Sequence, residues 1–139
     1  YKQAILDSGL EYDESLIIET HSKVLAGRAS TKRLLSLENP PDAIFSTSDF
    51  SALGAIQEIK SQGLRIPEDI SVVGFSNEPF TRFMELSITS VDQSPIEMGR
   101  KAALVFLEEV DKSLKTKKAQ QIVLQPELII RKSSLKTNL

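Results

Sequence analysis

Residues 66–75, Ile-Pro-Glu-Asp-Ile-Ser-Val-Val-Gly-Phe, constrain the fold of this chain more than any other stretch. Pro67 has no amide hydrogen and its ring disfavours helical geometry in the residue before it, so a helix cannot run through this position. The apolar, β-branched run at 70–75 is typical of a short strand that is buried on both faces. Gly74 allows the backbone to turn sharply, or to be approached closely, at the carboxyl end of that strand.

Short polar side chains follow this strand and an earlier one. Residues 76–78, Ser-Asn-Glu, come directly after the strand, and residues 46–49, Ser-Thr-Ser-Asp, follow a short apolar run at 43–45. Ligands of open α/β sheets bind at the carboxyl ends of the strands, so we expect the two loops to converge on one small ligand. Hydroxyl, amide and carboxylate groups suit a polyhydroxylated molecule, because each can exchange hydrogen bonds with a sugar hydroxyl. The alternative is that Ser48 or Asp49 only caps the following helix, which contributes about 1 kcal/mol.

Helical and strand patterns alternate along the whole chain. The sequence predicts helices at 1–8, 22–37, 50–62, 80–86 and 96–114, and strands at 16–19, 43–45, 70–75, 89–92 and 122–130. Pro126 interrupts the last strand or places it at an edge of the sheet. Such alternation predicts the α/β class, with a parallel sheet, helices on both faces and right-handed crossovers.

The composition excludes several kinds of site. The 139 residues suffice for one domain with a core, and a net charge of −2 provides no overall basic field for nucleic acid. The chain has no cysteine and only one histidine, His21, so we expect no disulfide and no metal site. It has neither a Gly-x-Ser-x-Gly elbow nor a glycine-rich phosphate loop, so we expect neither an enzyme nor a bound cofactor. No apolar run approaches the roughly 20 residues that span a bilayer.

Six stretches of the chain follow one family pattern in order. They are Pro-Asp-Ala-Ile-Phe at 41–45, Ser-Asp at 48–49 with Ala-Leu-Gly-Ala at 52–55, Gly-Leu-Arg-Ile-Pro-Glu-Asp at 63–69 with the strand to 75, Thr-Ser-Val-Asp-Gln at 89–93, Glu-Met-Gly-Arg-Lys-Ala-Ala at 97–103, and Pro-Glu-Leu-Ile-Ile-Arg at 126–131. Together they resemble the effector-binding core of the LacI/GalR transcriptional regulators. The resemblance covers nearly the whole chain.

This resemblance implies a periplasmic-binding-protein-like core of type I, in which an effector lies between two α/β subdomains. Residues 1–91 and 122–133 would form the carboxyl-terminal subdomain, residues 93–118 a crossover segment of the amino-terminal subdomain, and residues 134–139 a tail. The chain starts at Tyr1, inside a helical pattern, so we expect a part of a longer protein. The helix-turn-helix headpiece, the hinge helix and most of the other subdomain would precede it.

The crossover segment has an apolar face that the missing subdomain would normally cover. Ala103, Phe106 and Val110 lie on this face at helical spacing. We expect the face to pack elsewhere, to pair with another copy of the chain, or to be poorly ordered.

The resemblance also assigns roles to individual residues. Effector contacts would come from Ser22, Ser48, Asp49, Ser76, Asn77, Gln93 and Pro95. Ser22 stands where the family often has an aromatic ring, Ser48 where an asparagine is common, and Ser76 where an aspartate usually binds sugar hydroxyls. The dimer interface would involve Leu53, Ile56, Phe80 and Met84, and the alternative is that these four side chains belong to the core.

The function that follows from the resemblance is a cytoplasmic transcriptional regulator of carbohydrate or related metabolism. A sugar or a related effector would shift the relation between two subdomains, and with it the spacing of two DNA-binding headpieces. The protein would be a homodimer that binds DNA only through the headpiece and makes no membrane contact. The alternative is a periplasmic sugar-binding protein of a transport or sensing system, which shares the fold.

Overall fold

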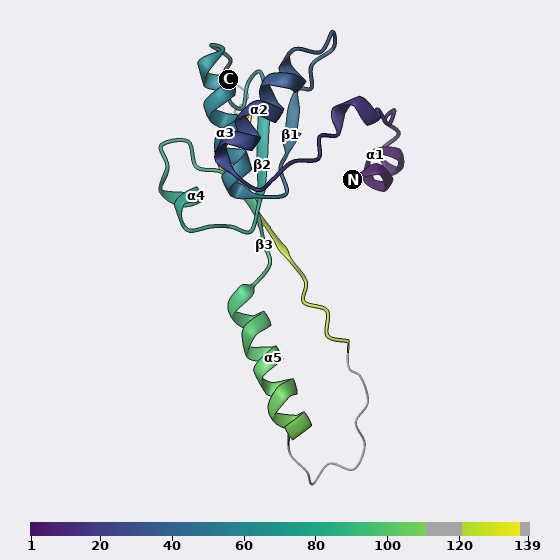
Figure 1. Cartoon of the computed structure of the whole chain (residues 1–139), viewed down its shortest axis with the longest axis vertical. Helices are drawn as coiled ribbons and strands as arrows, with labels where there is room; N and C mark the ends of the chain where they lie inside the picture. The colour runs from purple at the N-terminus through teal and green to yellow at the C-terminus, as the bar shows by residue number, and fades with distance from the viewer. Residues whose placement is uncertain (111–120, 137–139) are drawn as a thin grey trace.

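The structure of the chain is a computed structural model that describes residues 1–110 and 121–136, apart from the side chain of Glu109. Its elements, in chain order, are α1 (Lys2–Asp7), the short 3-10 helix η1 (Glu14–Leu16), α2 (Val24–Leu35), β1 (Ala43–Phe45), α3 (Asp49–Ser61), β2 (Ser71–Phe75), α4 (Phe80–Phe83), β3 (Thr89–Asp92), α5 (Pro95–Val110) and β4 (Glu127–Ile129). Figure 1 shows a body built around the sheet, from which α5 projects.

The four strands form one sheet in the order β1-β2-β3-β4. β1 pairs with β2, and β2 with β3, in parallel, whereas β4 is antiparallel to β3. The last strand begins after Pro126 and lies at the edge of the sheet, because proline cannot donate to a ladder. The predicted α/β class is therefore confirmed, with an antiparallel edge strand added to its parallel part.

The core lies between α3 and the sheet. Ala52, Ile56 and Ile59 recur at helical spacing on α3, so one face of the helix is apolar. The buried residues of the core cluster are Ala52, Ile56, Ile59, Ile70, Val72 and Ile88. Each fully buried isoleucine contributes roughly 1.5–3 kcal/mol relative to an exposed one. The opposite face of the sheet is more open, since Phe45 remains 52% exposed there.

Two glycines allow α2 and α3 to approach each other closely. A Cβ atom on Gly27 would collide with the backbone carbonyl of Ser51, and one on Gly54 would collide with the carbonyl of Val24. Both obstacles are backbone atoms, which cannot rotate away. The close packing of these helices therefore requires glycine at both positions.

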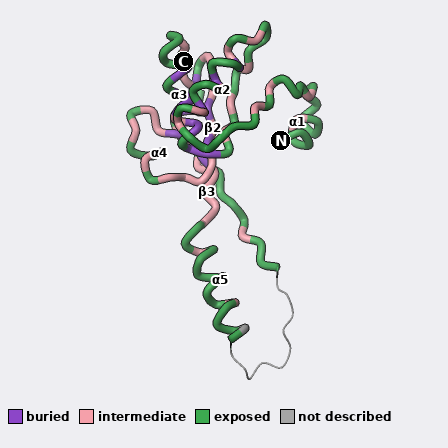
Figure 2. Tube along the Cα trace, viewed as in Figure 1, coloured by how far each residue is buried: buried purple, intermediate pink, exposed green. Residues whose placement is uncertain are grey.

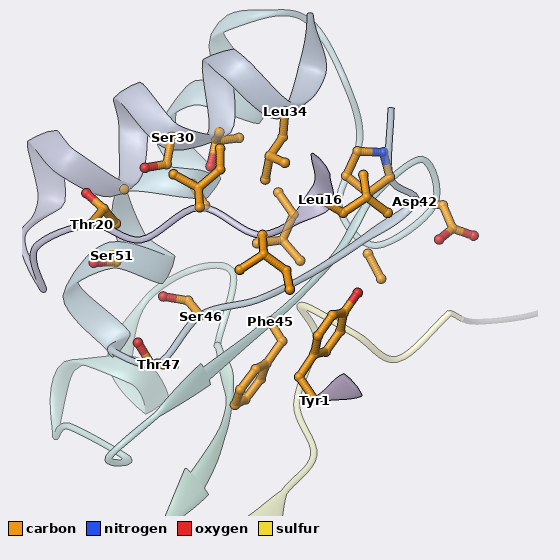
Figure 3. A pocket seen from close by; sticks show the side chains of 18 of the residues that line it. Tyr1, Leu16, Thr20, Ser30, Leu34, Asp42, Phe45, Ser46, Thr47 and Ser51 are labelled. Atoms are coloured by element: carbon orange, nitrogen blue, oxygen red, sulfur yellow. The ribbon is translucent and has the colours of Figure 1, made fainter. Parts of the chain in front are cut away.

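The prediction of a strand at 16–19 is wrong. The structure has η1 at its start, followed by extended chain that joins no ladder in the described part of the molecule. A groove of about 680 Å³ separates this extended chain from β1 (Figure 3). Apolar side chains, among them Leu16, Leu34 and Ile44, line much of it. A strand requires a ladder partner, and this extended chain has none among the described residues.

Helix α5 stands apart from the body, and its surface is mostly exposed (Figure 2). Ile96 is 81% exposed, Phe106 65% and Val110 57%. The apolar face expected on this helix is thus uncovered, and among the described residues it does not pack elsewhere. No helix of residues 1–110 or 121–136 is long and apolar enough to cross a membrane.

Candidate functional site

Four polar segments converge at the carboxyl edge of the parallel strands. Three of them follow β1, β2 and β3, whose carboxyl ends share one edge of the sheet. The fourth precedes α2, and the hydroxyl of Ser51 ties it to α3 by donating to the carbonyls of His21, at 3.3 Å, and Lys23, at 3.5 Å. The predicted convergence of the loops after β1 and β2 is therefore observed.

Asp49 connects three of these elements. It is the first residue of α3 and only 1% exposed. Its Oδ2 accepts from the amide of Glu78 at 2.7 Å, and its Oδ1 accepts from the hydroxyl of Ser90 at 2.7 Å. A carboxylate is also favoured at a helix N-terminus. Asp49 thus holds the loop after β2 against β3, a role that neither simple capping nor direct ligand contact anticipates.

Gly74 provides the space for this carboxylate. A Cβ atom on Gly74 would collide with Oδ1 of Asp49 and lie 3.4 Å from the Cβ of Ala52. Of the two expectations for Gly74, close approach is therefore the correct one. The sharp turn comes just after β2, at Ser76 and Asn77, with φ angles of +105° and +51°. Asparagine is several-fold enriched at positive φ among non-glycine residues, whereas serine is not, so Ser76 is the more strained of the two.

The side-chain amide of Asn77 makes hydrogen bonds through both its nitrogen and its oxygen. Its Nδ2 donates to Oδ2 of Asp92 at 2.7 Å, and its Oδ1 accepts from the guanidinium of Arg131 at 2.7 Å. The acceptor on one side and the donor on the other fix the orientation of the amide. The backbone amide of Asn77 also donates to the hydroxyl of Ser90 at 3.0 Å. Asn77 is therefore oriented by Asp92, Arg131 and Ser90, and the hydroxyl of Thr81 adds a longer contact of 3.5 Å to its Oδ1.

Ser76 and Gln93 meet at the same edge. Nε2 of Gln93 donates to Oγ of Ser76 at 3.3 Å, and both side chains are half-buried. Ser94, the next residue, has a φ of +53°. The three non-glycine residues with positive φ in the described part, namely Ser76, Asn77 and Ser94, all lie here. Such strain is concentrated at functional sites in proteins.

Asp92 and Arg131 belong to this site, although sequence reasoning did not assign them to it. The side-chain amide of Asn77, the backbone amide of Ser94 and, at longer range, the charge of Arg131 lower the pKa of Asp92. Both residues lie in stretches that resemble the family, and Asp92 ends a strand at the ligand-facing edge. The position at the strand end could have identified Asp92, but Arg131 follows the antiparallel strand and carried no such signal.

The other predicted effector residues are more dispersed. Ser48 is the buried N-cap residue of α3, but its side chain makes no capping hydrogen bond. Pro95 is exposed at the start of α5. Ser22 is exposed and lines the groove beside β1. Effector contact by these residues stays a prediction.

The residues predicted for a dimer interface are partly used inside the chain. Ile56 is 3% exposed and belongs to the core cluster, so little of its surface can meet a partner. Phe80 and Met84 are half-buried and pack against that cluster, and Leu53 is also half-buried. For Ile56 the alternative of a core residue is what the structure shows.

The site offers hydrogen-bonding groups from side chains and from backbone amides. Among residues 1–110 and 121–136, no three acidic or histidine side chains are grouped so as to hold a metal ion. The hydroxyls, amides and carboxylates of three adjacent loops instead lie at the edge of the sheet where open α/β domains, as a class, bind small molecules.

The chain belongs to the periplasmic binding protein-like domain family, whose model matches residues 1–134. The transcriptional repressor CytR of Escherichia coli (strain K12) is 38% identical over 110 residues, which are 79% of this chain and 32% of the repressor. The structure of the transcriptional regulator CelR in complex with cellobiose is 32% identical, with a TM-score of 0.88, and the match covers 96% of this chain and 40% of that one. A regulatory protein of the LacI family from Chloroflexus aggregans is also 32% identical, with a TM-score of 0.88, over 96% of this chain and 48% of that one.

These similarities confirm the resemblance to LacI-type regulators. They favour a regulator over a periplasmic transport protein, because the similar proteins are regulators of transcription. The chain spans about a third of the length of CytR and less than half of the two regulators of known structure.

Proposed function

We propose that this chain is the effector-binding part of a LacI-type transcriptional regulator and that it binds a sugar or a related small molecule at the carboxyl edge of its parallel strands. The observation that carries the proposal is the convergence of the loops after β1, β2 and β3. The backbone amide of Glu78 donates to Asp49, and side-chain hydrogen bonds join Asn77 to Asp92 and Gln93 to Ser76. The cellobiose complex of CelR, a protein of the same fold, supports a carbohydrate as the class of ligand.

Within this site, Ser76 and Gln93 are the primary effector contacts. The hydroxyl of Ser76 accepts from Gln93 and keeps its own proton for donation to a ligand. The bond between them is long, at 3.3 Å, so a ligand can replace it at small cost. Both oxygens of Asp49 already accept hydrogen bonds, so Asp49 acts mainly by holding the loop.

In the whole protein, the carboxyl-terminal subdomain would consist of residues 1–91 and 122–133, and residues 93–118 would cross to a second subdomain. That second subdomain would cover the apolar face of α5, where Leu107 is 62% exposed. The protein would act in the cytoplasm and contact DNA through a separate headpiece. It would have no catalytic activity.

The dimer interface would lie over α3 and α4, with Leu53, Phe80 and Met84 at its centre. Phe83, which follows on α4 and is 76% exposed, adds apolar area to the same surface. Analytical ultracentrifugation of the full-length protein tests this assignment. Phe83→Ser should shift the protein toward the monomer. Leu25→Ser, at a similarly exposed apolar residue on α2, should not.

A thermal-shift screen of the full-length protein against mono- and disaccharides, cellobiose among them, and against nucleosides tests the effector site. A ligand present at about 100 times its Kd stabilises the folded state by about 2.7 kcal/mol. Ser76→Ala and Gln93→Ala should reduce the shift, and Ser36→Ala, at an exposed serine that ends α2, should not. A screen without any shift, or a shift that both site variants retain in full, would contradict the proposal.

A further inference from the structure

The side-chain amide of Asn77 lies between two charged groups that come from different strands. Asp92, its partner at Nδ2, is the last residue of β3, and Arg131, its partner at Oδ1, follows just after β4. β3 leads directly into α5, and β4 brings the chain back into the sheet (Figure 1). Asn77 therefore joins the end of β3, where α5 is attached, to the residue that follows β4 beside the beginning of β3.

Each of the two charged partners is itself fixed. Oδ1 of Asp92 accepts from the amide of Ser94 at 2.6 Å, directly before α5 begins. The guanidinium of Arg131 also donates to the carbonyl of Ile88 at 2.7 Å and to the hydroxyl of Thr81 at 3.1 Å. A displacement at Ser94, where α5 is attached, therefore reaches Asn77 through Asp92.

The loop that contains Asn77 needs to be held. Ser76 and Asn77 have φ angles of +105° and +51°, which disfavour non-glycine residues. Such conformations persist only when the surrounding structure imposes them. In the described part of the chain, the hydrogen bonds that fix the side chain of Asn77 come chiefly from Asp92 and Arg131. Their loss removes the main restraints on the side chain of Asn77, while Asp49 and Ser90 still hold the backbone of the loop.

We propose that Asp92 and Arg131 are positioning residues for the effector loop 76–78, and that by holding Asn77 between them they couple the conformation of this loop to the attachment of α5. The inference rests on the proposed function only in that residues 76–78 contact the ligand. The coupling itself needs no ligand. A ligand group that replaces Asp92 at Nδ2 of Asn77 alters the start of α5, because Asp92 also accepts from the amide of Ser94.

An exchange of the two side chains tests the coupling. Asn77→Asp places a second carboxylate against Asp92, at a contact of 2.7 Å in the native chain, and the like charges repel. Asp92→Asn, combined with Asn77→Asp, restores a donor and an acceptor with their order reversed, and Arg131 still meets an acceptor oxygen at position 77. Asn39→Asp, at an exposed asparagine between α2 and β1, introduces the same new charge away from the site.

Hydrogen–deuterium exchange of the full-length protein at pH 7 provides the readout. Asn77→Asp should raise exchange about tenfold or more in residues 76–78 and also in residues 93–98. The combined variant should return both segments close to the native rates, and Asn39→Asp should change neither. A rise confined to residues 76–78, or a combined variant as fast as the single one, would overturn the coupling.

The combined variant keeps the test decisive if Asn77→Asp does not fold. A combined variant that folds with native exchange supports the pair, and one that also fails to fold refutes it. The test is separable from the ligand screen. If the combined variant regains native exchange but no ligand shifts the melting temperature, the coupling stands and the effector assignment falls. If a ligand shifts the melting temperature but the combined variant does not regain native exchange, the effector assignment stands and the coupling falls.

Discussion

The carboxylate of Asp49 lies over the Cα of Gly74, in the space that any side chain at position 74 would occupy. The first residue of α3 therefore reaches across β2 and binds the loop beyond it. This contact explains why a buried strand has glycine near its end. It also leads to the first of four predictions on stability.

Gly74→Ala should displace the carboxylate of Asp49 and break its bonds to Glu78 and Ser90. Leaving such groups without partners costs about 1–3 kcal/mol in the free energy of unfolding. Gly99→Ala is the matched control, because an added Cβ on this exposed residue of α5 meets nothing within 4 Å. The control should be neutral or stabilising by up to about 1 kcal/mol, since alanine favours helix. Equal urea midpoints for the two variants would refute the role of Gly74.

Gly54→Ala should separate α2 from α3. The added Cβ would meet the carbonyl of Val24 and lie 2.7 Å from the amide nitrogen of Arg28, both of them backbone atoms. Overpacking of this kind costs about 1–3 kcal/mol. The variant should also weaken the ion pair between Arg28 and Glu58, now 2.8 Å, which bridges the two helices. Chemical denaturation measures the loss, and an unchanged midpoint would show that the helices can move apart freely.

Ile59→Ala should destabilise the chain by about 2–5 kcal/mol, because it leaves a cavity at a fully buried position between α3 and the sheet. Ile96→Ala makes the same chemical change where the side chain is 81% exposed. It should alter the free energy of unfolding by less than about 0.5 kcal/mol. Calorimetry of the two variants gives the comparison, and similar losses would place the core elsewhere.

Asp69 should make a pH-dependent contribution to stability. The guanidinium and the backbone amide of Arg65 hold the pKa of Asp69 at about 2. The pKa of an aspartate in the unfolded chain is about 3.9. Because the folded value is the lower one, the stabilisation is present above about pH 4 and is lost as the pH falls toward 2.

Asp69→Asn should therefore lower stability slightly at pH 6, and the difference from the native chain should shrink between about pH 4 and pH 2. The effect is small because the Arg65 side chain is 70% exposed. Glu38→Gln, at another exposed carboxylate, serves as the control in urea titrations at each pH. A difference that persists unchanged at pH 2 would mean that the ion pair is not its cause.

Local patterns in the sequence were sufficient for most of the elements. The β-branched run at 70–75 forms β2 at Ser71–Phe75, and the helix predicted at 50–62 forms α3 at Asp49–Ser61. The same kind of pattern predicted a strand at 16–19 that does not form. A strand needs a neighbour at ladder distance, and apolar periodicity carries no information about whether that neighbour is present.

The amino-acid sequence by itself determined the class of fold, the order of its elements and the two polar loops that meet at the carboxyl edge, because these depend on residues close together in the chain. Only the tertiary structure decided which hydrogen bonds hold those loops in place. The partners of Asn77 lie 15 and 54 residues away in the sequence, and the partners of Asp49 lie 29 and 41 residues away. Hydrogen bonds over such separations depend on how the strands and helices pack, so no local pattern could reveal that Arg131 belongs to the site or that it shares Asn77 with Asp92.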